Sequence, residues 1–245
     1  MVIDFHTNLG CTQDFETEAE MLLREMDANG VDKAVVCPDD RYLAVYNSEG
    51  NDGIASVVRQ HPDRFIGFGC ASPWYGDKAV NEVSRIAELG LKGLKVHSFY
   101  QGFLLCDHIL DPVLDACRKA RLPVLAHTGT PVSATPFQLR ELAIRFPDVA
   151  FIMGHMGYAD FWYDITAASK DLDNIYLEWS YALHSWIEDA IDNCGIDRIL
   201  FGSDWPYSRE KIEIEKANLA CNTEERKKML GGNAARLLGI VEDVS

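Results

Sequence analysis

The feature that most limits the fold is a regular alternation of short apolar runs with stretches of helical periodicity. Eight runs of aliphatic and β-branched residues recur along the chain, and each leads through a polar or glycine-containing loop into an amphipathic stretch. Strands that alternate with helices pair in parallel, and eight such units close into a barrel. Since the chain has 245 residues and one such barrel needs about 250, we expect a single (β/α)8 TIM barrel of the α/β class over residues 1–245.

The boundaries of these units follow from the apolar runs and from the helix stop signals. Four helices should end before a glycine or a proline, and they are Phe15 to Asn29, Ala79 to Leu89, Pro112 to Ala120 and Phe137 to Phe146. The eight expected strands are Val2 to Thr7, Lys33 to Pro38, Phe65 to Ala71, Gly93 to His97, Pro123 to His127, Ala150 to His155, Asn174 to Trp179 and Arg198 to Ser203.

One segment interrupts this pattern. Asp39 to Ile54 is polar and contains two asparagines and two glycines. Such a composition favours a long loop, and a loop that gates the substrate is the alternative, because barrel enzymes place functional loops at this position.

Charge and cysteine content exclude several classes of partner. The net charge is −15, from 38 acidic and 23 basic residues, so a polyanion is repelled and we expect neither nucleic acid nor membrane as a partner. The seven cysteines are scattered and form no Cys-x-x-Cys pair, which indicates a reduced, cytoplasmic protein. The expected partner is a small-molecule substrate, and the sequence leaves the oligomeric state open, with a homodimer as one alternative.

Polar side chains stand at the carboxyl ends of five expected strands. In a barrel of this type the carboxyl ends carry the chemistry, whereas the opposite ends carry stability. These residues are His6 and Asn8 after the first strand, Lys95 and His97 on the fourth, His127 on the fifth, His155 on the sixth and Asp204 after the eighth.

The direction of the first strand's side chains follows from strand periodicity. Side chains alternate between the two faces of a strand, so Asp4, His6 and Asn8 should share one face. Ile3 and Phe5 should then point the other way, toward the helices. By this reasoning His6 faces the mouth of the barrel.

Three imidazoles and one carboxylate therefore converge on one rim, from His6, His127, His155 and Asp204. For any one of these histidines a structural role is at least as good an explanation as metal binding. Four such groups at four strand ends favour a metal site, because neutral imidazole and carboxylate suit Zn²⁺ and comparable divalent ions. A metal with an open position lowers the pKa of a bound water to about 7, which indicates hydrolytic chemistry.

At this point the chain resembles the amidohydrolase superfamily, in the amidohydrolase-related branch that includes aminocarboxymuconate semialdehyde decarboxylase, resorcylate decarboxylases and pyrone dicarboxylate lactonase. The resemblance runs over nearly the whole chain. Its segments are Ile3 to Asn8, Gly90 to His97, Pro123 to Gly129, Phe146 to Asp148, Gly154 to Gly157, Leu200 to Pro206 and Gly232 to Leu238.

The resemblance implies one divalent cation, held by the two positions of the first strand (His6 and Asn8), His127 and Asp204, with His155 acting on the substrate as acid, base or carbonyl polariser. The family pattern is Asp-x-His-x-His, and here Asn8 stands where the second histidine is expected. Since an amide oxygen is a poorer ligand for Zn²⁺ than imidazole, the affinity should fall. Zinc is the expected ion, with manganese as the alternative.

The remaining roles follow from position and residue type. Asp204 can touch the metal and also accept a proton from bound water, and His155 titrates in the range that acid–base catalysis needs. Lys95 and His97 are expected to bind the substrate, at its carboxylate or phosphate. A carboxylated Lys95 that bridges two metals is the disfavoured alternative, because that arrangement goes with an intact His-x-His.

These assignments predict a metal-dependent hydrolase of a small carboxylate-bearing metabolite, such as an amide or a lactone, with metal-activated water as the nucleophile. Two alternatives stay open. One is non-oxidative decarboxylation at the same site, and the other is a degenerate barrel that binds a ligand without turning it over, which Asn8 alone motivates.

Overall fold

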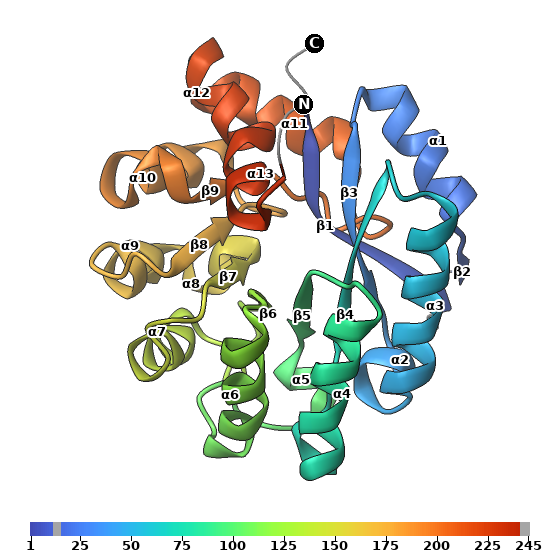
Figure 1. Ribbon diagram of the computed structural model, residues 1–245. Coiled ribbons are helices and arrows are strands. Elements are labelled where there is room, and N and C mark those ends of the chain that lie inside the picture. The colour runs from blue at the N-terminus through green and yellow to red at the C-terminus, as the bar shows by residue number, and fades with distance from the viewer. Residues whose placement is uncertain (12–15, 241–245) are drawn as a thin grey trace.

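A computed structural model describes residues 1–11 and 16–240, and it is a barrel of parallel strands surrounded by helices (Figure 1). The strand order is β2-β1-β3-β4-β5-β6-β7-β8-β9, in which only β2 is antiparallel to its neighbour. The strands are β1 (Ile3–Cys11), β2 (Glu16–Thr17), β3 (Lys33–Pro38), β4 (Phe65–Cys70), β5 (Gly93–Val96), β6 (Val124–His127), β7 (Phe151–Gly154), β8 (Ile175–Glu178) and β9 (Ile199–Leu200).

The barrel closes between its first and last parallel strands. The backbone N–H of Phe5 donates to the carbonyl of Phe201 (2.8 Å), and that of Asn8 donates to Trp205 (2.9 Å). In return, the N–H of Asp204 donates to the carbonyl of His6 (2.7 Å). Closure leaves eight parallel strands, so the expected (β/α)8 barrel is confirmed, and it also brings His6 and Asp204 side by side.

The helices form an outer ring around the strands (Figure 1). Short 3-10 turns occupy Pro73–Tyr75, His108–Leu110, His155–Gly157, Trp162–Asp164 and Ile196–Arg198, and a π-helical turn occupies Lys228–Gly232. The α-helices are α1 (Ala19–Asn29), α2 (Arg41–Ala44), α3 (Asn47–Gln60), α4 (Asp77–Glu88), α5 (Ser98–Gln101), α6 (Asp111–Ala120), α7 (Pro136–Arg145), α8 (Tyr158–Phe161), α9 (Ile165–Ser169), α10 (His184–Cys194), α11 (Glu210–Ala220), α12 (Thr223–Lys227) and α13 (Asn233–Leu238).

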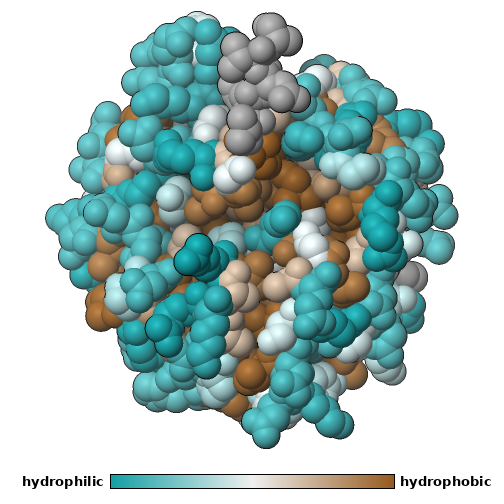
Figure 2. Space-filling view, viewed as in Figure 1, coloured by the Kyte–Doolittle hydropathy of each residue, from teal (hydrophilic) through white to brown (hydrophobic). Residues whose placement is uncertain are grey.

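Two apolar layers hold the barrel together. The larger lies between the strands and the helices, and it takes alternate strand residues such as Val36, Leu94 and Met153. The smaller fills the barrel itself with residues from six strands, and Ala234 and Ala235 of α13 pack against it. Figure 2 shows hydrophilic residues over the outer helices and hydrophobic residues toward the middle of this face. No helix among the described residues is long and apolar enough to cross a membrane.

The first strand departs from simple alternation. The register of β1 against β3 shifts between Asp4 and Thr7, which marks a β-bulge. Before the bulge, Ile3 and Phe5 point into the barrel and join its inner core, so the prediction that they face the helices was wrong. The extra residue then turns His6 inward as well. A bulge cannot be read from side-chain alternation, because it is the place where the alternation breaks.

The segment Asp39 to Ile54 is also different from the expected loop, since it contains α2 and the first half of α3. Its asparagines hold the end of β4 in place. Asn51 donates to the carbonyl of Cys70 (2.9 Å) and accepts from its N–H (2.8 Å). Gly50 packs directly on Tyr42, where an added Cβ would lie 2.8 Å from the Tyr42 Cβ. The polar composition predicts a loop, but these residues make tertiary contacts from within a helix.

The expected first helix began at Phe15, which lies outside the described residues, and the helix that the structure describes begins at Ala19. The other three expected helices agree with α4, α6 and α7 to within two residues at each end.

The core predicts a contrast between two glycine substitutions. In Gly93→Ala the new Cβ would overlap the Phe68 ring inside the barrel, whereas Gly53 lies exposed in α3 with no atom within 4 Å of its Cβ position. We expect Gly93→Ala to lower the free energy of unfolding by about 1–3 kcal/mol. Gly53→Ala should raise it by about 0.5–1 kcal/mol, because alanine favours the helix. Urea denaturation of both variants checks this, and equal effects would contradict the packing described.

Candidate active site

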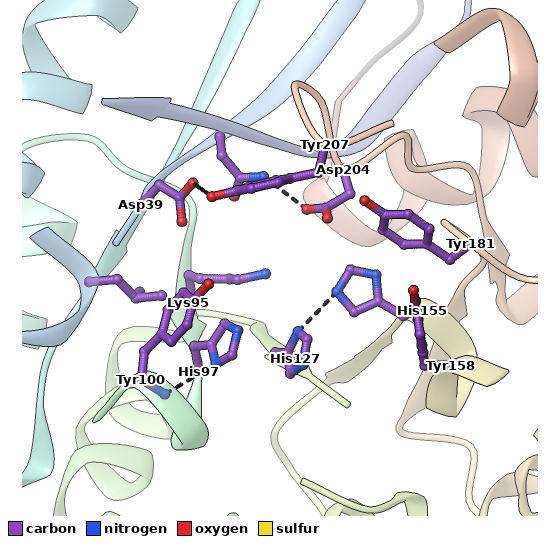
Figure 3. A pocket seen from close by; sticks show the side chains of 12 residues that line it. Asp39, Lys95, His97, Tyr100, His127, His155, Tyr158, Tyr181, Asp204 and Tyr207 are labelled. Atoms are coloured by element: carbon purple, nitrogen blue, oxygen red, sulfur yellow. Dashed lines mark hydrogen bonds between the residues drawn. The ribbon is translucent and has the colours of Figure 1, made fainter. Parts of the chain in front are cut away.

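A cavity of about 230 Å³ opens at the carboxyl ends of the strands (Figure 3). Six of the seven residues predicted from the sequence line it, and the seventh, His6, lies beneath them in contact with Asp204 and Lys95. The lining residues are Asn8, Asp39, Leu43, Lys95, His97, Tyr100, His127, His155, Tyr158, Tyr181, Asp204 and Tyr207.

His6 is held in one orientation by a buried carboxylate. Its Nδ1 lies 2.8 Å from Oε2 of Glu178, and both side chains are fully buried. Since an ionised carboxylate only accepts hydrogen bonds, Nδ1 carries the proton and Nε2 keeps its lone pair. That nitrogen lies 3.3 Å from Oδ1 of Asp204 and accepts a hydrogen bond from Nζ of Lys95. A carboxylate behind a histidine in this way fixes the tautomer that a metal needs.

The same carboxylate begins a directed chain of hydrogen bonds. Ser180 Oγ donates to Glu178 (3.0 Å), so it accepts from Nδ1 of His155 (2.7 Å). Nε2 of His155 must then accept from Nδ1 of His127 (3.0 Å). Nε2 of His127 in turn accepts from the hydroxyl of Thr130 (2.8 Å). The network assigns a tautomer to each ring, and it uses the Nε2 lone pair of His155 for the hydrogen bond from His127.

Burial keeps the imidazoles of the cavity neutral. It lowers the pKa of His127 to about 3, with Lys95 adding to the effect, and it lowers the pKa of His155 and of His97 well below the usual range. Burial alone would raise the pKa of Glu178, but the hydrogen bonds from His6 and Ser180 lower it. The site therefore combines neutral imidazoles with an ionised carboxylate behind them, and neutral imidazole is the form that binds metals.

Asp204 joins the site from the segment that follows the last strand, β9. Its backbone φ of 55° is left-handed, which aspartate tolerates better than most residues. Nδ2 of Asn8 donates to its Oδ1 (2.8 Å) and to the carbonyl of Trp205 (3.2 Å). Burial raises the pKa of Asp204, so this carboxyl group holds a proton more readily than an exposed aspartate does.

Three of these groups fit a divalent cation. Ligand atoms of His6, His155 and Asp204 all lie within 4.8 Å of one another. Two neutral imidazoles and a carboxylate are a donor set that divalent transition metals accept. Asn8 turns its amide nitrogen, not its oxygen, toward Asp204. His127 lies one hydrogen bond further out, behind His155.

Lys95 and His97 form one wall of the cavity. Lys95 is almost fully buried and lies against His6. The His97 ring is stacked between His127, with centroids 3.8 Å apart, and Tyr100, with centroids 4.0 Å apart. Its Nδ1 accepts from the backbone N–H of Tyr100 (3.4 Å). Because rings cover both of its faces, His97 is held in a fixed orientation in this wall.

Sequence reasoning missed six of the lining residues. Leu43 lies in α2, and the others follow the strand ends on segments whose conformation cannot be read from composition; these are Asp39, Tyr100, Tyr158, Tyr181 and Tyr207. Trp179 and His184, which follow the end of β8, are not among the lining residues. Trp179 packs on Phe201 in the core, and His184 starts α10.

Comparisons with known proteins identify the family. The amidohydrolase family profile matches residues 12–240. A 2-amino-3-carboxymuconate-6-semialdehyde decarboxylase from Dictyostelium discoideum is 38% identical over 78 residues, which is 31% of this chain but only 22% of that protein. A gamma-resorcylate decarboxylase from a Polaromonas species is 26% identical over 243 residues, covering 76% of this chain and 74% of its own.

Among solved structures, a dihydroxybenzoic acid decarboxylase from Polaromonas, with bound manganese and the inhibitor 2-nitroresorcinol, superposes with a TM-score of 0.81. The superposition covers 98% of this chain and 97% of that one, at 18% sequence identity. This likeness supports the fold. The family assignment depends on the family profile, which covers nearly the whole sequence. The chain belongs to the amidohydrolase family, and with the donor cluster of His6, His155 and Asp204 it is a metal-dependent enzyme of that superfamily.

Proposed function

We propose that the protein catalyses the non-oxidative decarboxylation of a small aromatic carboxylic acid with one divalent cation. The observation that carries this proposal is the buried cluster of His6, His155 and Asp204, in a chain that aligns over 76% of its length with a gamma-resorcylate decarboxylase. The sequence analysis ranked hydrolysis first. The relatives favour its alternative, decarboxylation, and the manganese in a solved relative makes Mn²⁺ at least as good a candidate as Zn²⁺.

The cavity suits one substituted ring. Its volume of about 230 Å³ is below the roughly 300–1,000 Å³ of pockets for drug-sized ligands. Four tyrosines line it, and aromatic side chains pack well against a planar ligand. Lys95 lines the cavity, where its ammonium group can attract the carboxylate of the substrate. The tyrosines are Tyr100, Tyr158, Tyr181 and Tyr207.

His6 and Asp204 would hold the cation, and the hydrogen-bonded pair of His127 and His155 would supply a third donor. His155 lies closer to the other two donors, while His127 is the ligand that the family resemblance implies. We assign the metal to His127 and the substrate to His155, because Ser180 and Glu178 orient His155 as a third group orients a catalytic base. The cation would neutralise the negative charge of the bound acid and fix its orientation.

Asp204 is the proposed proton donor. Its carboxyl group lines the cavity next to His6, so it is placed to pass a proton to a bound acid. Its proton passes to the ring carbon that bears the carboxylate, and a C–H bond forms there. The carbon–carboxylate bond then breaks, its electron pair returns to the ring, and carbon dioxide leaves. Asp204 regains a proton from solvent.

His155 is proposed to assist by accepting a hydrogen bond from the substrate. Its Nε2 carries the lone pair, since Nδ1 donates to Ser180. The substrate hydroxyl would take the place of His127 as the donor to this nitrogen once His127 binds the metal. A ring hydroxyl that donates to this nitrogen becomes more electron-rich, which makes the ring carbon a better proton acceptor. The low pKa of His155 keeps the ring neutral and able to accept.

The direct test measures carbon dioxide. Protein loaded with Mn²⁺ should release carbon dioxide from at least one hydroxylated benzoic acid in a panel, and chelation should abolish the release until metal is restored. Asp204→Asn, which cannot donate the same proton, should be slower by about 10²-fold or more. A protein that instead hydrolyses carboxylated lactones or amides, and releases no carbon dioxide, would show that the hydrolase alternative is right.

The two histidines of the pair can be separated by substitution. His127→Asn should lose most of the bound metal, whereas His155→Asn should keep the metal and lose about 10²-fold in kcat. Elemental analysis and steady-state kinetics measure the two effects. If His155→Asn loses the metal and His127→Asn keeps it, His155 is the metal ligand and His127 contacts the substrate.

Asn8 gives a further prediction. Asn8→His adds an imidazole beside Asp204 and should tighten Zn²⁺ binding by about tenfold or more if the site holds a metal. Calorimetric titration of chelator-treated wild type and variant measures this. Absence of binding to both proteins would rule out the metal site, and equal tight binding would place Asn8 outside the coordination shell.

A further inference from the structure

A second polar group faces the cavity from the side away from the histidines. Asp39 follows β3 directly, is 6% exposed, and lies across the cavity from His155 and Tyr181 (Figure 3). Oδ2 of Asp39 accepts from the hydroxyl of Tyr207 (2.8 Å), and Oδ1 accepts from the backbone N–H of Asp40 (2.8 Å). The Asp39–Tyr207 pair therefore forms a fixed part of the cavity wall.

The pair offers a ligand a hydrogen-bond acceptor. A carboxylate oxygen accepts two hydrogen bonds, so each oxygen of Asp39 can take one more. Tyr207 has one hydroxyl proton, and it is used on Asp39. Burial and the Asp39 carboxylate raise the pKa of Tyr207, so that proton stays in place. A ligand group that meets Asp39 must therefore be a donor.

The charges of the cavity reinforce this conclusion. Lys95 is the lysine among the described residues that line the cavity, and the reacting carboxylate of the ligand would pair with it, while Asp39 lies across the cavity from His155. None of the described residues that line the cavity is an arginine. A second carboxylate on the ligand would therefore meet Asp39 without a cation to neutralise it, and like charges in a buried site repel strongly.

We propose that Asp39 determines specificity by accepting a hydrogen bond from a hydroxyl or amino group of the substrate, on the part remote from its reacting carboxylate. The substrate class is then an aromatic monocarboxylic acid with a donor substituent, and a dicarboxylic acid is rejected. This inference rests on the proposed function for the place of the reacting carboxylate. Asp39 would then select the substrate, which is a role that neither the metal ligands nor the proton donor has.

The test compares ligands that differ in one donor. Each ligand is a dihydroxybenzoate with one hydroxyl at position 2. It is compared with its methyl ether, in which the other hydroxyl is methylated. Binding to the Mn²⁺-loaded protein is measured by calorimetry, separately from carbon dioxide release. At least one dihydroxybenzoate should bind wild type about tenfold or more tightly than its ether, because a hydrogen bond to a charged group is strong.

Substitutions show whether Asp39 is responsible. Asp39→Asn should lose most of that preference and should bind a 2-hydroxybenzoate with a second carboxylate more tightly than wild type does. Asp40→Asn is the matched control. It makes the same chemical change at the neighbouring residue, which does not line the cavity. It should keep the preference. Steric exclusion of the methyl group would persist in Asp39→Asn, so the variant isolates the hydrogen bond.

The outcomes separate this inference from the proposed function. A wild-type protein without any hydroxyl preference, or an Asp39→Asn variant that retains it, would overturn the role of Asp39 even where carbon dioxide is released. A preference that depends on Asp39, in a protein that releases no carbon dioxide, would support the role of Asp39 and contradict decarboxylation. Thermal unfolding and metal content of both variants, matched to wild type, exclude misfolding as the cause.

Discussion

The rest of the site depends on one buried carboxylate, Glu178 at the end of β8. It accepts from Nδ1 of His6, from the N–H and hydroxyl of Ser180, and from the N–H of His155. A fully buried charge is costly unless hydrogen bonds replace its lost hydration, and here four donors do so. Gly202 leaves the room for it, because a Cβ at that position would overlap the Glu178 side chain. Through these bonds one residue sets the tautomers of both histidines.

Much of the fold and part of the site could be predicted from the sequence, because both rest on local patterns. Eight apolar runs define the strands, and the strand ends define where His6, His127, His155 and Asp204 meet. The β-bulge in β1, the helices within residues 39–54, and the tyrosines of the cavity could not be predicted. Each depends on contacts between distant segments, such as Asn51 with Cys70, that leave no periodic signal.

The bulge in β1 shows how the site and the core share one strand. Phe5 fills the barrel and packs edge-on against Phe68, with ring centroids 5.6 Å apart. One residue later, His6 also points inward, above that packed layer. Regular alternation would have turned one of the two away from the barrel axis. The bulge therefore lets a core residue, Phe5, and a candidate metal ligand, His6, follow each other directly in the sequence and both face the inside of the barrel.

Asn8 then has a physical role that differs from a weakened metal ligand. Its amide donates to Oδ1 of Asp204 and to the carbonyl of Trp205, so it ties the first strand to the segment that closes the barrel. This bond uses only Oδ1 of Asp204. It lowers the pKa of that carboxyl group, while burial, the larger influence, raises it. An imidazole at this position would compete for the metal and give up the donor to Asp204. The hydrogen bonds of Asn8 thus fix the orientation of the carboxyl group that we propose as the proton donor.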